Sequence, residues 1–333
     1  IAYVLKAVTG SFSGVEPTLV SGMFDEFVNS PVQLLVWHSV FMVATMLVVV
    51  RGVKGGLEKA VRFLMPSLFV LLLLLVAYAM TTDAYQQGID FLFVPDFSKI
   101  TSDSVLTAMG HAFFTLSLGM GAIMVYGSYL PKNISIAKTA FVIAGADTVV
   151  ALLAGIAIFP LVFTNGLEPS SGPGLIFQTL PIAFGQMTGG LIFGTLFFVL
   201  LVFAALSSSI SLIEPAVAWL VENRNWSRRQ ACIWAGGITW VLGLGTVFSF
   251  NIWSDFKIFD RTIFELLDYL TANLMLPLGG FFMAIFAGWI MHKQHCKDEL
   301  QLDGLAFKCW HFLVKYIAPV AVFMVFGHVI GIV

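Results

Sequence analysis

Hydroxyl side chains and glycines interrupt one long apolar stretch, HAFFTLSLGMGAIMVYGSYL, which covers residues 111–130. Thr115 and Ser117 precede a Gly-Met-Gly triplet at residues 119–121. Inside a membrane, backbone leaves the helix only where protein buries it or where it lines a wet cavity. A broken helix offers free N–H groups to anions and free carbonyls to cations. We therefore expect a break between two half-helices here; the alternative is that the small residues only allow close helix packing.

A single acid, Asp147, lies near the middle of the apolar stretch VIAGADTVVALLAG. Ionisable residues inside a membrane are costly and are functional candidates by default. Its oxygens suit a cation, and the alternative is a structural hydrogen-bonding role.

A serine cluster marks a further apolar stretch, FAALSSSISLIEP, at residues 203–215. Ala204, Ser207, Ser208 and Leu212 fall on one face of a helix. Two hydroxyls and a backbone carbonyl are oxygens that a small hard cation accepts. A nucleophilic serine is less favoured because no His or Lys lies beside the cluster. Ser209 is assigned to helix packing.

Two acids stand near the ends of apolar stretches. Asp268 lies in FELLDYLTANLMLPLGG and Glu222 follows the serine cluster. Each can form half of a gating salt bridge, and each can equally be an ordinary solvated helix end.

Composition identifies the surroundings of these residues. Of 333 residues, 59% are hydrophobic and 11% are charged, whereas soluble domains have about 25% charged residues. Apolar runs of helical length recur without the period-two alternation of a membrane barrel. We therefore predict an all-α, polytopic helical membrane protein. The net charge of −2 and the lack of a basic tract give no reason to expect nucleic acid. Cys232, Cys296 and Cys309 have no metal-ligand spacing and are expected to be reduced.

Eight spans are predicted within one transmembrane domain covering residues 1–333. Their approximate bounds are 32–50, 57–81, 104–130, 134–163, 188–221, 228–249, 262–291 and 307–332. The chain begins IAYVLKAVTGSF, without Met, and we expect this to be the end of a helix in a longer protein.

The loops between these spans alternate in charge. The basic loops, with residues such as Lys54, Lys132 and Arg224, are expected on the cytoplasmic side. They cover residues 51–62, 131–138, 222–229 and 292–308. The long outer loops at 9–31 and 164–187 contain apolar residues and are expected to fold back as short helices.

The chain resembles the sodium:neurotransmitter symporter family. The resemblance rests on the stretch FFTLSLGMGAIMVYGSYL, on Asp147, which lies 32 positions after Thr115, and on Ser207, which lies 92 positions after it. Within this family, the chain is most similar to bacterial amino-acid transporters of the tyrosine and multi-hydrophobic types. RGVKGGLEKAVRFLMPSLF resembles the inner loop and fifth span of that family, and FQTLP at residues 177–181 resembles its fourth outer loop.

The resemblance implies a leucine-transporter-like fold of two inverted five-helix repeats in the plasma membrane. It also implies that this chain lacks the first two spans and most of the third. The missing spans would complete two sodium sites, both incomplete in this chain, and a midplane site for a neutral amino acid.

The resemblance also assigns roles to individual residues. Thr115 and Asp147 correspond to ligands of the first sodium site, and Ala204, Ser207 and Ser208 to ligands of the second. The residues corresponding to the substrate site are Phe114, Thr115, Ser117, Met120, Ser208 and Leu212. Those corresponding to gates are Asp268, Glu222, Tyr129, Phe177, Gly56 and Pro66.

Three positions depart from the bacterial leucine transporter of the family. That protein has Asn at the position of Asp147, Phe at the position of Met120, and a carboxylate where this chain has Ala151. Because Asp147 itself supplies a carboxylate, chloride is not expected as a co-ion.

The favoured hypothesis is sodium-coupled import of neutral amino acids, with bulky hydrophobic or aromatic side chains preferred. A non-transporting amino-acid sensor and a proton-coupled permease remain alternatives. An intramembrane enzyme would need a nucleophile–base pair or a metal-ligand cluster, and the sequence has neither in one segment.

Overall fold

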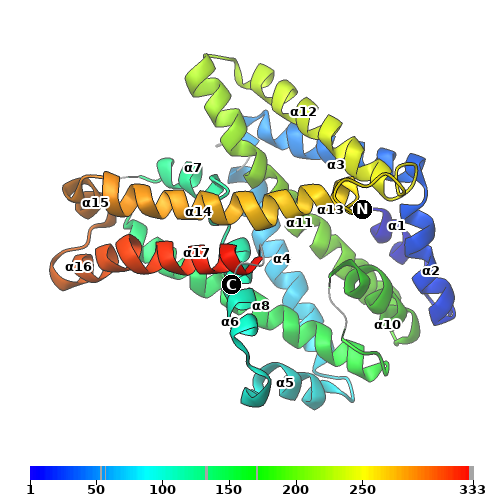
Figure 1. Ribbon diagram of the computed structural model, residues 1–333. Coiled ribbons are helices and arrows are strands. Elements are labelled where there is room, and N and C mark those ends of the chain that lie inside the picture. The colour runs from blue at the N-terminus through cyan, green and yellow to red at the C-terminus, as the bar shows by residue number, and fades with distance from the viewer. Residues whose placement is uncertain (53–54, 57, 132–133, 170–171, 330–333) are drawn as a thin grey trace. The chain divides into compact units, whose positions relative to one another are not determined.

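The computed structural model describes residues 1–52, 55–56, 58–131, 134–169 and 172–329 (Figure 1). These residues form helices and turns, and their single β-bridge joins Ile258 to Arg261. Lys54, Lys132 and the predicted span ends at residues 57 and 330–332 lie outside the described residues. The cysteines are unpaired, as expected.

Seven helical segments in the described residues are long and apolar enough to cross a membrane. Five are continuous helices: α3 (Pro31–Val49), α4 (Glu58–Ala79), α8 (Ile136–Thr164), α11 (Gly190–Arg224) and α12 (Arg228–Ser249). The other two, Ile263–Ile290 and Gly304–His328, contain π-helical turns. All seven lie where spans were predicted, and the eighth predicted span, 104–130, is divided into two shorter helices.

The two spans with π-helical turns are built from several segments. The first comprises α13 (Ile263–Asp268), η4 (Tyr269–Met275), α14 (Leu276–Ile285) and η5 (Phe286–Ile290). The second comprises α16 (Gly304–Phe312), η6 (Leu313–Ile317) and α17 (Ala318–Val329). π-Helical turns widen a helix by one residue and are frequent at functional sites. The sequence pattern did not predict them.

Helix ends follow from capping chemistry. α12 begins after Ser227, which forms a reciprocal capping box with Gln230. α3 has Pro31 in its first turn, where the missing N–H costs no hydrogen bond. These local signals explain why the predicted start of α12 and the observed start agree.

Both long outer loops contain short helices, as predicted. The first loop forms α2 (Pro17–Val28), and the second forms α9 (Gly172–Gly174), η3 (Leu175–Thr179) and α10 (Leu180–Gln186). α1 (Ala2–Val8) lies where the end of a helix was expected. Three further short elements were expected as loops: α5 (Tyr85–Phe93), η2 (Phe97–Lys99) and α15 (Lys293–Leu300).

The chain divides into two compact units. Unit 1 comprises Ile1–Pro95 and Val150–Phe264, and unit 2 comprises Asp96–Val149 and the residues from Glu265 onward. In unit 1, α11 packs against α1, α3, α4, α10 and α12. An aromatic core lies around it, with Tyr3, Phe12 and Phe198 almost fully buried. In unit 2, α17 packs against α14 and against α6 (Ser102–Thr115).

Candidate functional site

The predicted helix break is confirmed. α6 ends at Thr115 and α7 (Ala122–Ser128) begins seven positions later, with turns between them. The backbone is left-handed at Ser117 (φ 54°), Gly119 (φ 82°) and Gly121 (φ 82°). Glycine adopts this conformation without a steric penalty, whereas a serine there is strained by about 1–3 kcal/mol. The Gly-Met-Gly triplet therefore explains why the helix breaks at this position.

Backbone-to-backbone packing holds the break against α14 within unit 2. A Cβ atom at Gly119 would overlap the carbonyl oxygen of Leu276, and one at Gly279 would lie 2.5 Å from the carbonyl oxygen of Gly119. A Cβ atom at Gly280 would lie 2.5 Å from the ring of Phe113. The small residues therefore have both of the roles considered for them, since they break the helix and they also allow close packing against α14. Sequence reasoning gave Gly279 and Gly280 no role, although their adjacency was a visible signal.

Thr115 and Asp147 meet at the end of α6. The Thr115 hydroxyl donates a 2.9 Å hydrogen bond to Oδ1 of Asp147, which α8 supplies. The two residues are 32 positions apart and belong to the same unit. A hydroxyl and a carboxylate are hard oxygen donors, the type that Na⁺ accepts. The pair therefore fits a cation at the point where the helix ends and its last carbonyls lose their intrahelical partners.

Of the other predicted residues of unit 2, all but Asp268 lie within or beside this break in sequence. Phe114 and Tyr129 are exposed, and Ser117 and Met120 are half-buried. Asp268 is exposed at the last position of α13, directly before η4. Its carbonyl accepts a hydrogen bond from the Thr271 hydroxyl. The structure thus places Asp268 at a junction between two helix types.

In unit 1, α11 carries the predicted residues of the serine cluster. The Ser207 hydroxyl donates to the Ala204 carbonyl at 2.9 Å, so two of the predicted ligand oxygens are adjacent. Ser208 and Leu212 are exposed. The packing role of Ser209 is confirmed, because its hydroxyl lies 2.9 Å from that of Thr45 on α3.

The gate residues of unit 1 have varied surroundings. Phe177 stacks on Phe24 at a centroid distance of 5.6 Å and contacts Tyr3 at 4.9 Å, so it belongs to the aromatic core. Glu222 is exposed near the end of α11. Pro66 lies inside α4. A Cβ atom at Gly56 would overlap the Val48 carbonyl oxygen, so close packing also requires this glycine.

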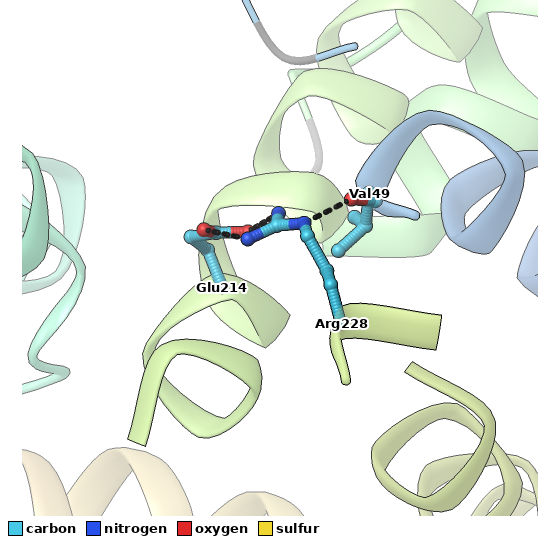
Figure 2. A network of polar contacts seen from close by, with 3 residues as sticks. All are labelled: Val49, Glu214 and Arg228. Atoms are coloured by element: carbon cyan, nitrogen blue, oxygen red, sulfur yellow. Dashed lines mark hydrogen bonds and ion pairs between the residues drawn. The ribbon is translucent and has the colours of Figure 1, made fainter. Parts of the chain in front are cut away.

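Sequence reasoning missed one buried ion pair, which Figure 2 shows. Glu214 of α11 is fully buried, and its two carboxylate oxygens accept hydrogen bonds of 3.0 and 2.6 Å from Arg228 of α12. The Arg228 Nε also donates to the Val49 carbonyl at 2.8 Å, at the end of α3. The sequence did contain a signal for this pair, because an acid lies inside the apolar α11 and an arginine lies at the start of the next helix.

These features define a class. A multi-pass helical membrane protein with a broken helix and hard oxygen ligands at the break has the architecture of a secondary transporter. Comparison with protein families matches residues 17–332 to the sodium:neurotransmitter symporter family. The chain belongs to this family, whose members are membrane transporters and not enzymes.

Known proteins agree with this assignment. The chain is 36% identical to the sodium-dependent transporter YhdH of Bacillus subtilis (strain 168), over 100% of this chain and 74% of that protein. It is 33% identical to a sodium-dependent transporter of Haemophilus influenzae, over 98% of this chain and 73% of that protein. The crystal structure of MhsT in complex with L-phenylalanine matches with a TM-score of 0.88 and 41% identity, covering 97% of this chain and 74% of that one. The chain therefore has a leucine-transporter-like fold and is a multi-pass plasma-membrane protein.

Proposed function

We propose that this protein is a sodium-coupled symporter that imports neutral amino acids, with bulky hydrophobic or aromatic side chains preferred. The observation that carries the proposal is the Thr115–Asp147 contact at the end of the broken helix α6. Two further findings support it: the relatives in Bacillus and Haemophilus are named as uncharacterized sodium-dependent transporters, and the similar solved structure holds L-phenylalanine.

Sodium is a co-transported ion in this proposal, with two sites. Thr115 and Asp147 supply oxygens to the first, and Ala204, Ser207 and Ser208 supply oxygens to the second. For the second site, the Ser207 hydroxyl must turn from the Ala204 carbonyl, its present acceptor, so that both oxygens face the ion. This rearrangement is small because hydroxyls rotate freely about one bond. Chloride is not required, because Asp147 provides the negative charge beside the first ion.

The amino acid is recognised in two parts. Backbone and hydroxyl groups at Phe114, Thr115 and Ser117 lie at the carboxyl end of α6 and hold the ammonium group of the substrate, since free carbonyls at the end of a half-helix favour a positive charge. Of the residues that the family resemblance assigns to the substrate's side chain, Met120 lies beside the break in unit 2, and Ser208 and Leu212 lie on α11 of unit 1. The aromatic ring of Phe114 covers the substrate from outside.

Coupling follows from linkage between ligands. Sodium and amino acid bind the same closed state, so each raises the affinity for the other. Asp268 and Phe177 act in the outer gate, and Glu222 and Tyr129 act in the inner gate. Gly56 and Pro66 weaken the start of α4 and let water reach the second sodium.

The test is uptake of labelled phenylalanine by proteoliposomes that contain the purified protein. We expect accumulation with an inward sodium gradient and none with potassium in its place. Thr115→Val should lower the apparent sodium affinity at least about tenfold, since it removes a ligand oxygen. Thr148→Val is the matched control, because the Thr148 hydroxyl bonds only its own helix, at the Ala144 carbonyl, among the described contacts.

Two other results would contradict the proposal. Uptake that follows a pH gradient and ignores sodium identifies a proton-coupled permease. Saturable phenylalanine binding without any uptake identifies a sensor.

A further inference from the structure

A groove of about 590 Å³ lies between α3 and α12, which pack side by side in unit 1 (Figure 1). We call it the α3–α12 groove. Its volume lies within the range of about 300–1,000 Å³ typical of small-molecule sites. The residues that line it are Ser39, Met42, Val43, Met46, Leu47, Val50, Arg229, Cys232, Ile233, Gly236, Gly237 and Trp240.

Two adjacent glycines form one wall of the groove. A Cβ atom at Gly236 would lie 2.9 Å from Cγ of Met46, so this glycine lets α3 and α12 approach closely. A Cβ atom at Gly237 would meet nothing within 4 Å, so this glycine leaves space open. Val43, Leu47 and Ile233 are 58%, 54% and 63% exposed along the same two helices. The groove is therefore apolar and opens to the surroundings of the helices, which in this protein are lipid.

The length of the groove corresponds to one leaflet of a bilayer. Along α12 its lining runs from Arg229 to Trp240, a rise of about 16 Å at 1.5 Å per residue. The hydrocarbon core of a membrane is about 30 Å thick, so this is about half of it. The indole N–H of Trp240 donates to the Ser39 hydroxyl at 3.0 Å, which satisfies the polar edge of the ring within the groove.

Charge is present at one end of the groove. Arg229 belongs to the basic loop that the positive-inside rule assigns to the cytoplasmic side. Its neighbour Arg228 is engaged by Glu214 and the Val49 carbonyl. In the part of the chain that the structure describes, Arg229 is exposed and has no ion pair. An arginine in this position attracts a phosphate, because its planar guanidinium donates hydrogen bonds to two phosphate oxygens at once.

We propose that the α3–α12 groove binds one anionic phospholipid of the cytoplasmic leaflet. The headgroup phosphate pairs with Arg229, and one acyl chain lies along the groove past Gly237 to Trp240. This inference is independent of the proposed substrate and sodium sites, none of whose residues line the groove.

The test measures lipid bound to the purified protein. Native mass spectrometry of the protein, stripped of lipid in mild detergent and titrated with phosphatidylglycerol or phosphatidylcholine, gives the affinity of each. We expect one phosphatidylglycerol to bind more tightly than phosphatidylcholine. Gly237→Leu should fill the groove and lower occupancy at least about fivefold, and Arg229→Gln should weaken phosphatidylglycerol about fivefold and phosphatidylcholine less, because the choline cation offsets the phosphate charge.

Matched controls separate these effects from general ones. Gly145→Leu adds the same side chain at a glycine of α8 that also has open space around it. Arg224→Gln removes a charge from the same basic loop, outside the groove. Both should bind phosphatidylglycerol like the wild type.

Three results would overturn the proposal. In the first, Gly237→Leu and Gly145→Leu bind phosphatidylglycerol equally. In the second, Arg229→Gln lowers affinity no more than Arg224→Gln. In the third, Gly237→Leu shifts the protein from dimer to monomer without changing lipid binding, which would assign the groove to a second copy of the chain.

Discussion

Arg228 donates two hydrogen bonds, of 3.0 and 2.6 Å, to the buried carboxylate of Glu214. Its Nε donates a third to the Val49 carbonyl at the end of α3. One side chain thus ties α3, α11 and α12 together (Figure 2). The exposed fraction is 0% for the Glu214 side chain and 24% for that of Arg228. A carboxylate buried so deeply needs hydrogen-bonding partners, which Arg228 supplies.

Replacing one partner of this pair should lower the free energy of unfolding more than replacing both partners. Arg228→Met leaves Glu214 buried without its arginine, and we expect the free energy of unfolding to fall by about 3–5 kcal/mol. The double variant Glu214→Leu/Arg228→Met should recover much of that loss, since no uncompensated charge remains. Equilibrium unfolding in mixed micelles measures both. Arg224→Met is the control, because its guanidinium rests 5.6 Å from the centre of the exposed Trp219 ring. Equal stability of Arg228→Met and Arg224→Met would show that the pair contributes little.

The packing of Gly119 against Leu276 gives a second prediction. Gly119→Ala places a methyl group against the Leu276 carbonyl at a residue with φ 82°. Because the contact is backbone to backbone, no side chain can move aside, and we expect uptake to fall at least about tenfold with a lowered melting temperature. The control is Gly145→Ala, which meets open space in α8 and should retain uptake. Normal uptake by Gly119→Ala would mean that the break opens away from α14.

Local signals in the sequence predicted much of this fold, and distant partners account for the rest. Apolar runs predicted the spans, and Gly119 and Gly121 predicted the break, because both act within a few residues. The contact of Gly119 with Leu276 joins segments far apart in the chain, and no local pattern specifies it. Glu214 and Arg228 are 14 positions apart on consecutive helices, so their pairing could have been predicted from the sequence. The resemblance to a family brought Thr115 and Asp147 together before their contact was observed. The π-helical turn η4, which follows Asp268, has no local residue pattern that predicted it.

Met120 predicts the range of substrates. Its side chain is flexible and unbranched, and it lies between two glycines whose backbone is left-handed. We expect Leu, Tyr and Trp all to compete with labelled phenylalanine for uptake. Met120→Phe replaces this adaptable group with a rigid ring and should weaken competition by Trp more than competition by Leu. Competition by Gly and Ala alone would contradict the proposed role of Met120.

Asp147 predicts the anion requirement of transport. In the proposed first sodium site its carboxylate balances the ion, with the Thr115 hydroxyl 2.9 Å from Oδ1. An ionised carboxylate within a membrane needs a partner of opposite charge, which sodium supplies in the loaded carrier. Uptake should therefore be chloride-independent, and Asp147→Asn should lower the apparent sodium affinity at least about tenfold because one full charge is lost. The measurement is sodium-driven uptake in chloride and in chloride-free gluconate buffer, for the wild type and for Asp147→Asn. The variant should gain a response to chloride, since an anion can then occupy the position of the lost charge. A wild type that already requires chloride would show that Asp147 does not supply this charge, and the proposed first sodium site would then be wrong.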